Sequence, residues 1–439
     1  MGFTRRHRSL LEKNPRGRAL RAASLQPVSL DFVAKATLVT IPFRICAMLA
    51  VAFAITACSA SDGSSNVPST PAQSDALARS VPAWQAYHLA RPACAHAARG
   101  QAQCLALIES GLGDTYSGGW SPSDFQAAYN LPSATKGKGQ IVAIVDAYDN
   151  PDVASDLAVY RSTFGLGKAK FKKFNEYGQQ KNYPPGDYGW GVEIDLDVEM
   201  VSAVCPACTI YLIEANTAYS NNDLSVAEAE AVTLGAHVVS NSWICYPSSC
   251  SVDAGDFATA GVAYLAGSGD AGYNENGPPE ALGNVISVGG TVLSKTGSGY
   301  SETVWDGAGG GCATGNKKPA WQHDPDCASR TDADVSAVAW DVAEYDTYYE
   351  DGWFTVGGTS VATPLTSGIV ALAGNADKSH AGKKFWTMKT AQRKKDLHYI
   401  SSGSDGSCGG EYLCTAGTEQ FGTYSGPSGW GTPDGVSAY

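Results

Sequence analysis

Basic residues are scarce in most of this chain. The 439 residues include 31 Lys/Arg against 43 Asp/Glu, and because residues 1–44 hold nine of the bases, the remainder has a net charge of −19. An acidic body repels phosphates, which argues against nucleic acid as a partner. The 44% apolar content and 49 glycines exclude a disordered chain and are typical of one large domain with extensions.

The chain also lacks an apolar run long enough to cross a membrane comfortably. Its best candidate, ICAMLAVAFAITAC at 45–58, follows Arg44 and suits the apolar part of an export signal. The run ends in ITAC, which is similar to the bacterial lipobox, in which the cysteine becomes lipidated. We predict a removable leader at 1–57 and a possible lipid anchor on Cys58, with ordinary cleavage near Ala60 as the alternative.

The segment after the leader has almost no large apolar residues. Its Ser/Pro/Ala-rich sequence SASDGSSNVPSTPAQSDA predicts a flexible tether at 58–85. A short extension is expected at 86–117 and a folded domain at 118–439.

Twelve cysteines fall into a simple pattern once Cys46 and Cys58 are assigned to the leader. The other ten form pairs that are local in sequence: Cys94/Cys104, Cys205/Cys208, Cys245/Cys250, Cys312/Cys327 and Cys408/Cys414. Five disulfides indicate an exported protein that is periplasmic, cell-surface or extracellular. The CPAC motif could instead be a redox or zinc site, but no second CxxC or histidine cluster accompanies it.

Strands and helices alternate from about residue 138. Apolar strands are predicted at 139–148, 209–215, 237–243, 261–269 and 284–290, and helices at 151–165, 223–236, 256–260 and 360–372. Near-continuous apolar strands between helices predict an α/β fold with a mainly parallel sheet covered on both faces. Active sites in such sheets lie at the carboxyl ends of the strands.

The stretch VGGTSVATP at 356–364 presents Ser360 as a nucleophile at the start of a helix, with Pro364 expected in its first turn. A serine hydroxyl needs a base, most often histidine. None of the seven histidines has the glycine-rich setting of a subtilisin-type catalytic histidine. The base is therefore sought among the carboxylates.

Glu193 and Asp197 are four residues apart in a helical pattern and share one face. Paired carboxylates on a partly apolar face share protons and split their pKa values. A solvated acidic face is the alternative, and it is the role expected for Asp195 and Glu199. Asp270 follows a buried strand in YLAGSGDAG, where a protonated acid can donate a hydrogen bond to an oxyanion; a turn role is its alternative.

From about residue 118 the chain resembles the sedolisin family, the serine-carboxyl peptidases with a subtilisin-like fold. The matching stretches are EIDLD, GSGDAG and GGTSVATP, supported by VSNSW, VGGT, ETVW and DVSAV. The resemblance implies Ser360 as nucleophile, Glu193 as general base and acid, Asp197 as its orienting partner and Asp270 as oxyanion donor. It also implies endopeptidase or tripeptidyl-peptidase activity on proteins or peptides at acid pH. Because the groups that titrate are carboxyl groups, we expect the maximum of activity at roughly pH 3–5.

Two features depart from the family pattern. The family's calcium site uses two acids, but Tyr399 and Ser425 stand at the matching positions, so no cofactor is expected unless Asp405 or Asp434 substitutes. Many relatives also have a large folded pro-domain, for which the span between Cys58 and residue 118 leaves no room.

Two other functions remain as alternatives. One is a catalytically silent surface protein that keeps the peptidase fold for binding. The other is a histidine-dependent subtilisin-like protease.

Overall fold

The computed structural model describes residues 90–246, 249–297, 299–376, 382–409 and 411–439. The chain divides into two units, Met1–Ser69 and Thr70–Tyr439, and every described residue belongs to the second. The expected leader, its Cys58 and the tether lie outside the described residues and stay predictions. Within the described part, no helix combines the length and apolar character needed to cross a membrane.

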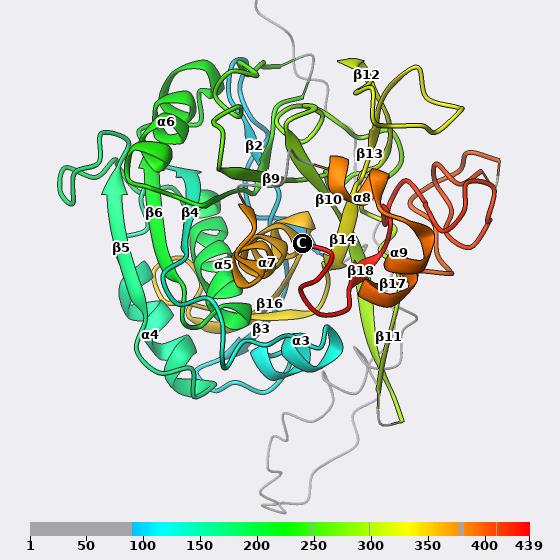
Figure 1. Ribbon diagram of the computed structural model, residues 1–439. Helices are drawn as coiled ribbons and strands as arrows, with labels where there is room; N and C mark the ends of the chain where they lie inside the picture. Colours follow the sequence, from blue (N-terminus) through cyan, green and yellow to red (C-terminus); the bar gives the residue numbers. More distant parts are fainter. Residues whose placement is uncertain (1–89, 247–248, 298, 377–381, 410) are drawn as a thin grey trace, which may run out of the picture. The chain divides into compact units, whose positions relative to one another are not determined.

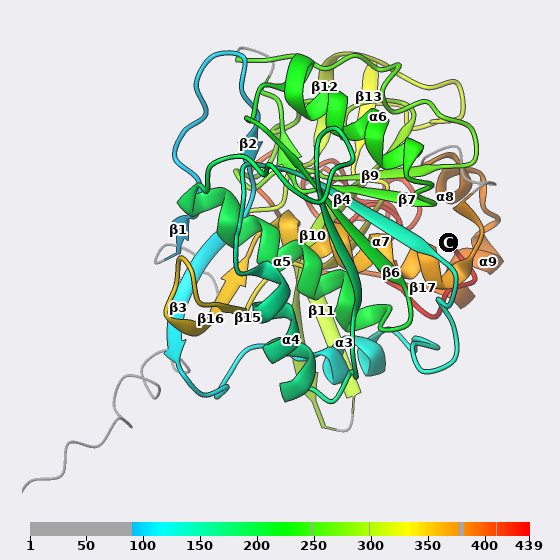
Figure 2. The ribbon, with the colours of Figure 1, turned by 90° about the vertical axis from the view of Figure 1, so that its left-hand side faces the viewer.

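An eight-stranded sheet forms the centre of the second unit (Figures 1 and 2). Its order is β11-β10-β9-β7-β4-β6-β5 with β14 beside β10, and every pairing except β10–β11 is parallel. The strands are β4 (Ile141–Ala147), β5 (Lys170–Asn175), β6 (Thr209–Ala215), β7 (Val238–Asn241), β9 (Ala263–Gly267), β10 (Val285–Thr296), β11 (Gly299–Val304) and β14 (Val335–Val338). The predicted mainly parallel sheet is confirmed.

Helices cover both faces of this sheet. On β4, Val142 and Ile144 join the core cluster that contains residues of α4 (Val153–Thr163), α5 (Tyr188–Val204) and α7 (Thr359–Ala373). The alternate residues Ala143 and Val145 join the cluster that contains residues of α6 (Ser225–Thr233). Because successive side chains of a strand point to opposite faces, the two clusters lie on opposite sides of the sheet. The fold is therefore the expected α/β fold, a mainly parallel sheet covered by helices on both faces.

A smaller four-stranded sheet has the order β1-β3-β16-β15 and joins the N-terminal extension to the strand before Ser360. Its strands are β1 (Arg91–Pro92), β3 (Leu107–Gly113), β15 (Val342–Asp346) and β16 (Gly352–Gly357). The remaining elements are β2 (Gln103–Cys104), α3 (Pro122–Ala128), η3 (Ser220–Leu224), β8 (Trp243–Ile244), β12 (Gly311–Lys317), β13 (Ser329–Asp332), α8 (Lys383–Thr387), α9 (Thr390–Asp396), β17 (Leu397–His398) and β18 (Thr432–Pro433).

Two local expectations were wrong. Residues 256–260 form no helix, because Asp253 closes a turn by accepting a hydrogen bond from Gly255 N and Gly261 has a positive φ of 88°. Pro364 does not lie in the first turn of α7, which begins at Thr359. In this second-turn position it has no N–H to donate to the carbonyl of Ser360.

All five expected disulfides are present in the structure. Cys205 and Cys208 are bridged with a Cα–Cα distance of 5.4 Å at the end of α5, which confirms the structural interpretation of the CPAC motif.

Candidate active site

The four candidate residues come from three elements that meet at the carboxyl end of the sheet. Glu193 and Asp197 are on α5, Asp270 follows the end of β9, and Ser360 is the second residue of α7. The sheet thus brings together residues that are up to 167 positions apart in the chain. Glu193, Asp197 and Ser360 have no exposed surface.

Asp197 and Ser360 are linked through Ser242, which follows β7. The Ser242 hydroxyl donates to Asp197 Oδ1 at 2.6 Å, and the Ser360 hydroxyl is directed at the Ser242 carbonyl at 3.5 Å. Among the described residues, no hydrogen bond from a histidine reaches Ser360, Glu193 or Asp197. The bases available to Ser360 are therefore carboxylates.

Burial raises the pKa of Glu193 well above its usual range, and the carboxyl group of Asp146 raises it further. The Ser360 hydroxyl and two backbone N–H groups oppose this shift. The pKa of Asp197 is likewise raised by burial, by Asp146 and by Glu193. Three buried carboxyl groups beside one another favour a shared proton over full ionisation.

Asp146 was not singled out from the sequence. It lies in β4, both of its carboxyl oxygens are buried without a hydrogen-bond partner, and burial raises its pKa to about 8. Its only sequence signal is an acid near the carboxyl end of an apolar strand, which is also common at structural positions. Because it raises the pKa of both Glu193 and Asp197, it belongs to the same cluster of buried carboxyl groups.

Asp270 is held through one of its two carboxyl oxygens. Its Oδ1 accepts hydrogen bonds from Thr359 N and Thr359 Oγ1, both at 2.8 Å, whereas its buried Oδ2 has no partner. Burial raises the pKa of Asp270 well above the usual value, and the Thr359 N–H opposes the shift. Asp270 Oδ2 lies 2.6 Å from the position that a Cβ atom on Gly358 would occupy, so glycine at 358 leaves room for this oxygen.

The expectation that Asp195 and Glu199 form a solvated face was wrong. Both side chains are fully buried, because α4 and β15 pack against this side of α5. Asp195 Oδ2 accepts a hydrogen bond from Asn150, and Glu199 Oε2 accepts one from Tyr345 N at 3.1 Å. The helix therefore buries carboxyl groups on two opposite faces.

The N-terminal extension reaches the candidate site, which sequence reasoning missed. Glu193 Oε2 accepts hydrogen bonds from Leu105 N at 2.9 Å and from Ala106 N at 2.7 Å. Leu105 N also lies 3.3 Å from the Ser242 carbonyl. No motif in residues 103–106 could have indicated these contacts, because they are backbone contacts.

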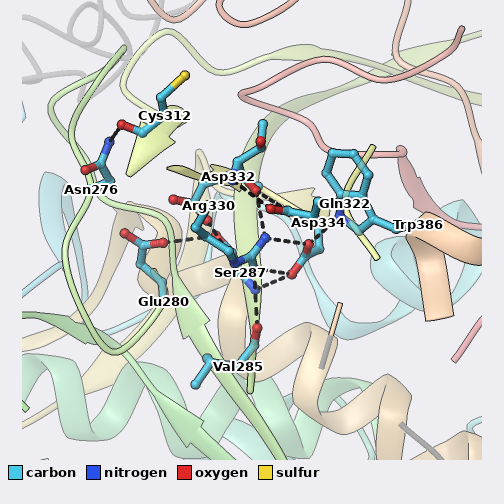
Figure 3. Close-up of polar contacts among 12 residues, drawn as sticks. Asn276, Glu280, Val285, Ser287, Cys312, Gln322, Arg330, Asp332, Asp334 and Trp386 are labelled. Carbon is cyan, nitrogen blue, oxygen red and sulfur yellow. Dashed lines mark hydrogen bonds and ion pairs between the residues drawn. The ribbon is translucent and has the colours of Figure 1, made fainter. Parts of the chain in front are cut away.

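The DVSAV stretch, one of the family-like motifs, has a structural role. Figure 3 shows Asp334 between Arg330 and Trp386, and it accepts hydrogen bonds from both side chains. Asp334 Oδ2 also accepts from Ser287 N at 3.0 Å. This buried network ties β10, β13 and α8 together and includes none of the four candidate residues.

The matching residues for the family's calcium site do not supply its carboxylates. Ser425 Oγ is 2.5 Å from Ser428 Oγ, which satisfies it within its own turn, and Tyr399 is partly exposed. Both carboxyl oxygens of Asp405 are buried without a hydrogen-bond partner, and burial raises the pKa of this group to about 8. Asp434 Oδ1 accepts a hydrogen bond from Asn130 at 2.7 Å. Tyr399 and Ser425 therefore do not supply the carboxylate ligands that a calcium ion prefers, and of the two acids that could substitute only Asp405 has both carboxyl oxygens without a partner.

The fold and the serine site define a class of protein. The chain belongs to the subtilase family, because the family model of that description matches residues 178–409, which is more than half of the chain and includes all four candidate residues.

Within that family the chain is sedolisin-like. Kumamolisin from Bacillus sp. (strain MN-32) is 28% identical over 295 residues, which cover 57% of this chain and 51% of kumamolisin. Sedolisin from Pseudomonas sp. (strain 101) is 27% identical over 368 residues, which cover 73% of this chain and 61% of sedolisin. The chain thus spans about half to three fifths of the length of these two relatives.

A solved structure agrees with these relatives. It is that of Pseudomonas sedolisin, a serine-carboxyl proteinase, complexed with two molecules of pseudo-iodotyrostatin. It has a TM-score of 0.61 and 25% identity, and the alignment covers 73% of this chain and 96% of that chain. Together these comparisons confirm the resemblance to the sedolisin family.

Proposed function

We propose that this protein is a serine-carboxyl peptidase that hydrolyses peptide bonds of protein or peptide substrates at acid pH through an acyl-enzyme on Ser360. The observation that supports this most strongly is the serine hydroxyl beside a buried carboxyl cluster. A carboxylate base suits acid pH because it is partly ionised where a histidine would already be protonated.

The reaction assigns a separate task to each residue. Ser360 Oγ attacks the substrate carbonyl while Glu193 takes its proton, and Glu193 then returns that proton to the leaving amine. Asp197 is a positioning residue that orients Glu193 and shares a proton with it. Asp270, protonated on Oδ2, donates a hydrogen bond to the substrate carbonyl oxygen when negative charge develops on that oxygen. No cofactor takes part.

Export and anchoring belong to the same proposal. Five disulfides support an oxidising location, and the ITAC sequence supports a lipid on Cys58 that would hold the protein at a membrane surface. If Cys58→Ala left both the mass and the membrane association of the mature protein unchanged, the lipid anchor would be wrong.

A serine-directed phosphonate tests the nucleophile. We expect one covalent adduct per chain on Ser360, formed at pH 4 and lost in Ser360→Ala together with hydrolysis of a denatured protein substrate. Ser367→Ala is the matched control, because Ser367 is also a buried serine on α7 and its hydroxyl has no partner. An unmodified Ser360 at pH 4, or full hydrolysis by Ser360→Ala, would contradict the proposal.

A further inference from the structure

Glu275 lies against the loop that carries Asp270. β9 ends at Gly267, and the chain then passes through Gly269, whose φ of 110° lies in the region that favours glycine. A Cβ atom placed on Gly269 would be 2.8 Å from Glu275 Oε2, so the absence of a side chain at 269 leaves room for this carboxyl group. The Glu275 carboxyl group is therefore packed on the backbone immediately before Asp270.

Glu275 also binds the backbone on the other side of Asp270. Its Oε2 accepts a hydrogen bond from the N–H group of Ala271, the residue that follows Asp270. Its Oε1 accepts a hydrogen bond from the hydroxyl group of Tyr246. The backbone of Glu275 belongs to the same loop, because Glu275 N donates to the Gly272 carbonyl at 3.0 Å. Glu275 thus connects the loop of Asp270 to the segment that follows β8.

Tyr246 is itself held in a short turn. Its carbonyl oxygen accepts hydrogen bonds from Ser249 N at 2.8 Å and from Cys250 N at 3.1 Å. The disulfide between Cys245 and Cys250 closes the same turn. Because the backbone of this turn is fixed at both ends, the Tyr246 hydroxyl group is presented to Glu275 from a defined position.

The two carboxyl groups of this loop have different environments. Burial raises the pKa of Glu275, whereas the Tyr246 hydroxyl and two backbone N–H groups oppose the rise because they stabilise the ionised form. Burial raises the pKa of Asp270 well above its usual value, and the carboxyl groups of Glu275 and, more weakly, Glu193 on α5 raise it further. When two neighbouring carboxyl groups interact, the first to ionise keeps the proton on the other. Glu275 has the more favourable donors and ionises first, so its charge keeps the proton on Asp270.

We propose that Glu275, held by Tyr246, is a positioning residue that orients Asp270 and sets the upper pH limit of the peptidase; this inference rests on the proposed function. Glu275 acts through the backbone of residues 269–271 and through its charge. A donor that is fixed before the reaction requires no reorganisation when charge develops on the substrate. A negative charge beside Asp270 also keeps it a hydrogen-bond donor at a pH at which an isolated aspartic acid is ionised.

Glu275→Gln separates the charge from the contacts. The amide oxygen can still accept from Ala271 N, and the Tyr246 hydroxyl can accept from the amide nitrogen. The high-pH limb of the kcat/KM profile should move to lower pH by about one unit or more, while kcat at the pH optimum stays within about threefold of the parent. Asp253→Asn is the matched control, because it removes a negative charge from an exposed turn before β9 and keeps the acceptor for Gly255 N. It should move the limb by less than about 0.2 units.

Glu275→Ala removes the contacts as well as the charge. It should lower kcat at the pH optimum by about tenfold or more with KM within about twofold, because a loosened Asp270 loses stabilisation of the transition state and not of the bound substrate. Tyr246→Phe should also lower kcat in the parent, but by less than about twofold in Glu275→Ala, where the hydroxyl group has lost its partner. A raised KM with an unchanged kcat would mean that Glu275 contacts the substrate and would overturn the positioning role.

Infrared spectroscopy gives a test that needs no activity. In Ser360→Ala, the carboxyl C=O band that Asp270→Asn removes should disappear at a lower pH once Glu275→Gln is added. If the parent hydrolyses a denatured protein substrate but neither the band nor the high-pH limb moves in Glu275→Gln, the inference alone is wrong. If the parent hydrolyses no peptide bond at any pH, the proposed function is wrong and the inference falls with it. Should the Glu275 variants fail to fold, Tyr246→Phe keeps the carboxyl group, and an undiminished kcat in this variant would overturn the role of the pair.

Discussion

Asp346, at the end of β15, makes the stability of the fold depend on pH. Burial raises its pKa to about 6, and Asp156 contributes, while the N–H groups of Tyr349 and Tyr348 oppose the shift. The pKa of Asp346 in the folded state is raised above its unfolded value of about 3.9, so the folded state binds this proton more tightly than the unfolded state. The resulting contribution to the stability of the fold is fully present below pH 4 and is lost as the pH rises through 6. A rise of two pKa units on folding corresponds to about 3 kcal/mol of unfolding free energy between low and high pH.

Asp346→Asn removes this pH dependence without removing a hydrogen-bond acceptor. Asp346 Oδ1 accepts from Tyr348 N at 2.7 Å and from Tyr349 N at 2.9 Å, and an amide oxygen can do the same. We therefore expect the variant to unfold with nearly the parent's free energy at pH 4 but to be more stable by about 3 kcal/mol at pH 7.

Urea denaturation at pH 4, 5, 6 and 7 measures this difference, with Ser360→Ala as the parent so that self-digestion does not interfere. Asp351→Asn is the matched control, because Asp351 is exposed in the same turn between β15 and β16 and should change stability by less than about 0.5 kcal/mol at each pH. A difference between Asp346→Asn and its parent that is the same at pH 4 and pH 7 would refute the reasoning.

Three further predictions concern the site. Glu193→Gln should lower kcat on the order of a hundredfold or more and remove the acid limb of the pH–rate profile, which belongs to the coupled Glu193–Asp197 pair; an undiminished rate would end the serine-carboxyl assignment. Asp270→Ala should lower kcat by about 10²–10³ with little change in KM, and in the parent, activity should fall as the pH rises and Asp270 ionises. Chelation with EDTA at pH 4 should leave the melting temperature unchanged, because Tyr399 and Ser425 replace the expected acids; destabilisation that added calcium reverses would indicate a site built from other oxygens.

The candidate residues could be identified from the sequence because their signals are local. Glu193 and Asp197 are one helical turn apart, and Ser360 stands in a glycine turn before a helix. Asp270 follows an apolar strand whose carboxyl end is the usual place for an active site. The disulfide pairs were equally local, since the widest spans 15 residues.

The same helix shows what local signals leave open. From the sequence, Asp195 and Glu199 could be placed on the face opposite Glu193, but whether that face meets water depends on the elements packed against it. β15 lies about 150 residues further along the chain, and only its docking together with α4 turns a solvated face into a buried one. No periodicity within α5 carries that information.

The sequence by itself therefore predicted the fold class and four candidate site residues, because each depends on side-chain type and short-range spacing. The roles of those residues were predicted from the resemblance to the sedolisin family. Only the tertiary structure decided that Asp146 lies with the carboxyl groups of the candidate site and that Leu105 N and Ala106 N contact Glu193. The first depends on which strand meets α5. The second depends on backbone N–H groups, which every non-proline residue carries, so no sequence pattern distinguishes the segment that they hold beside Glu193.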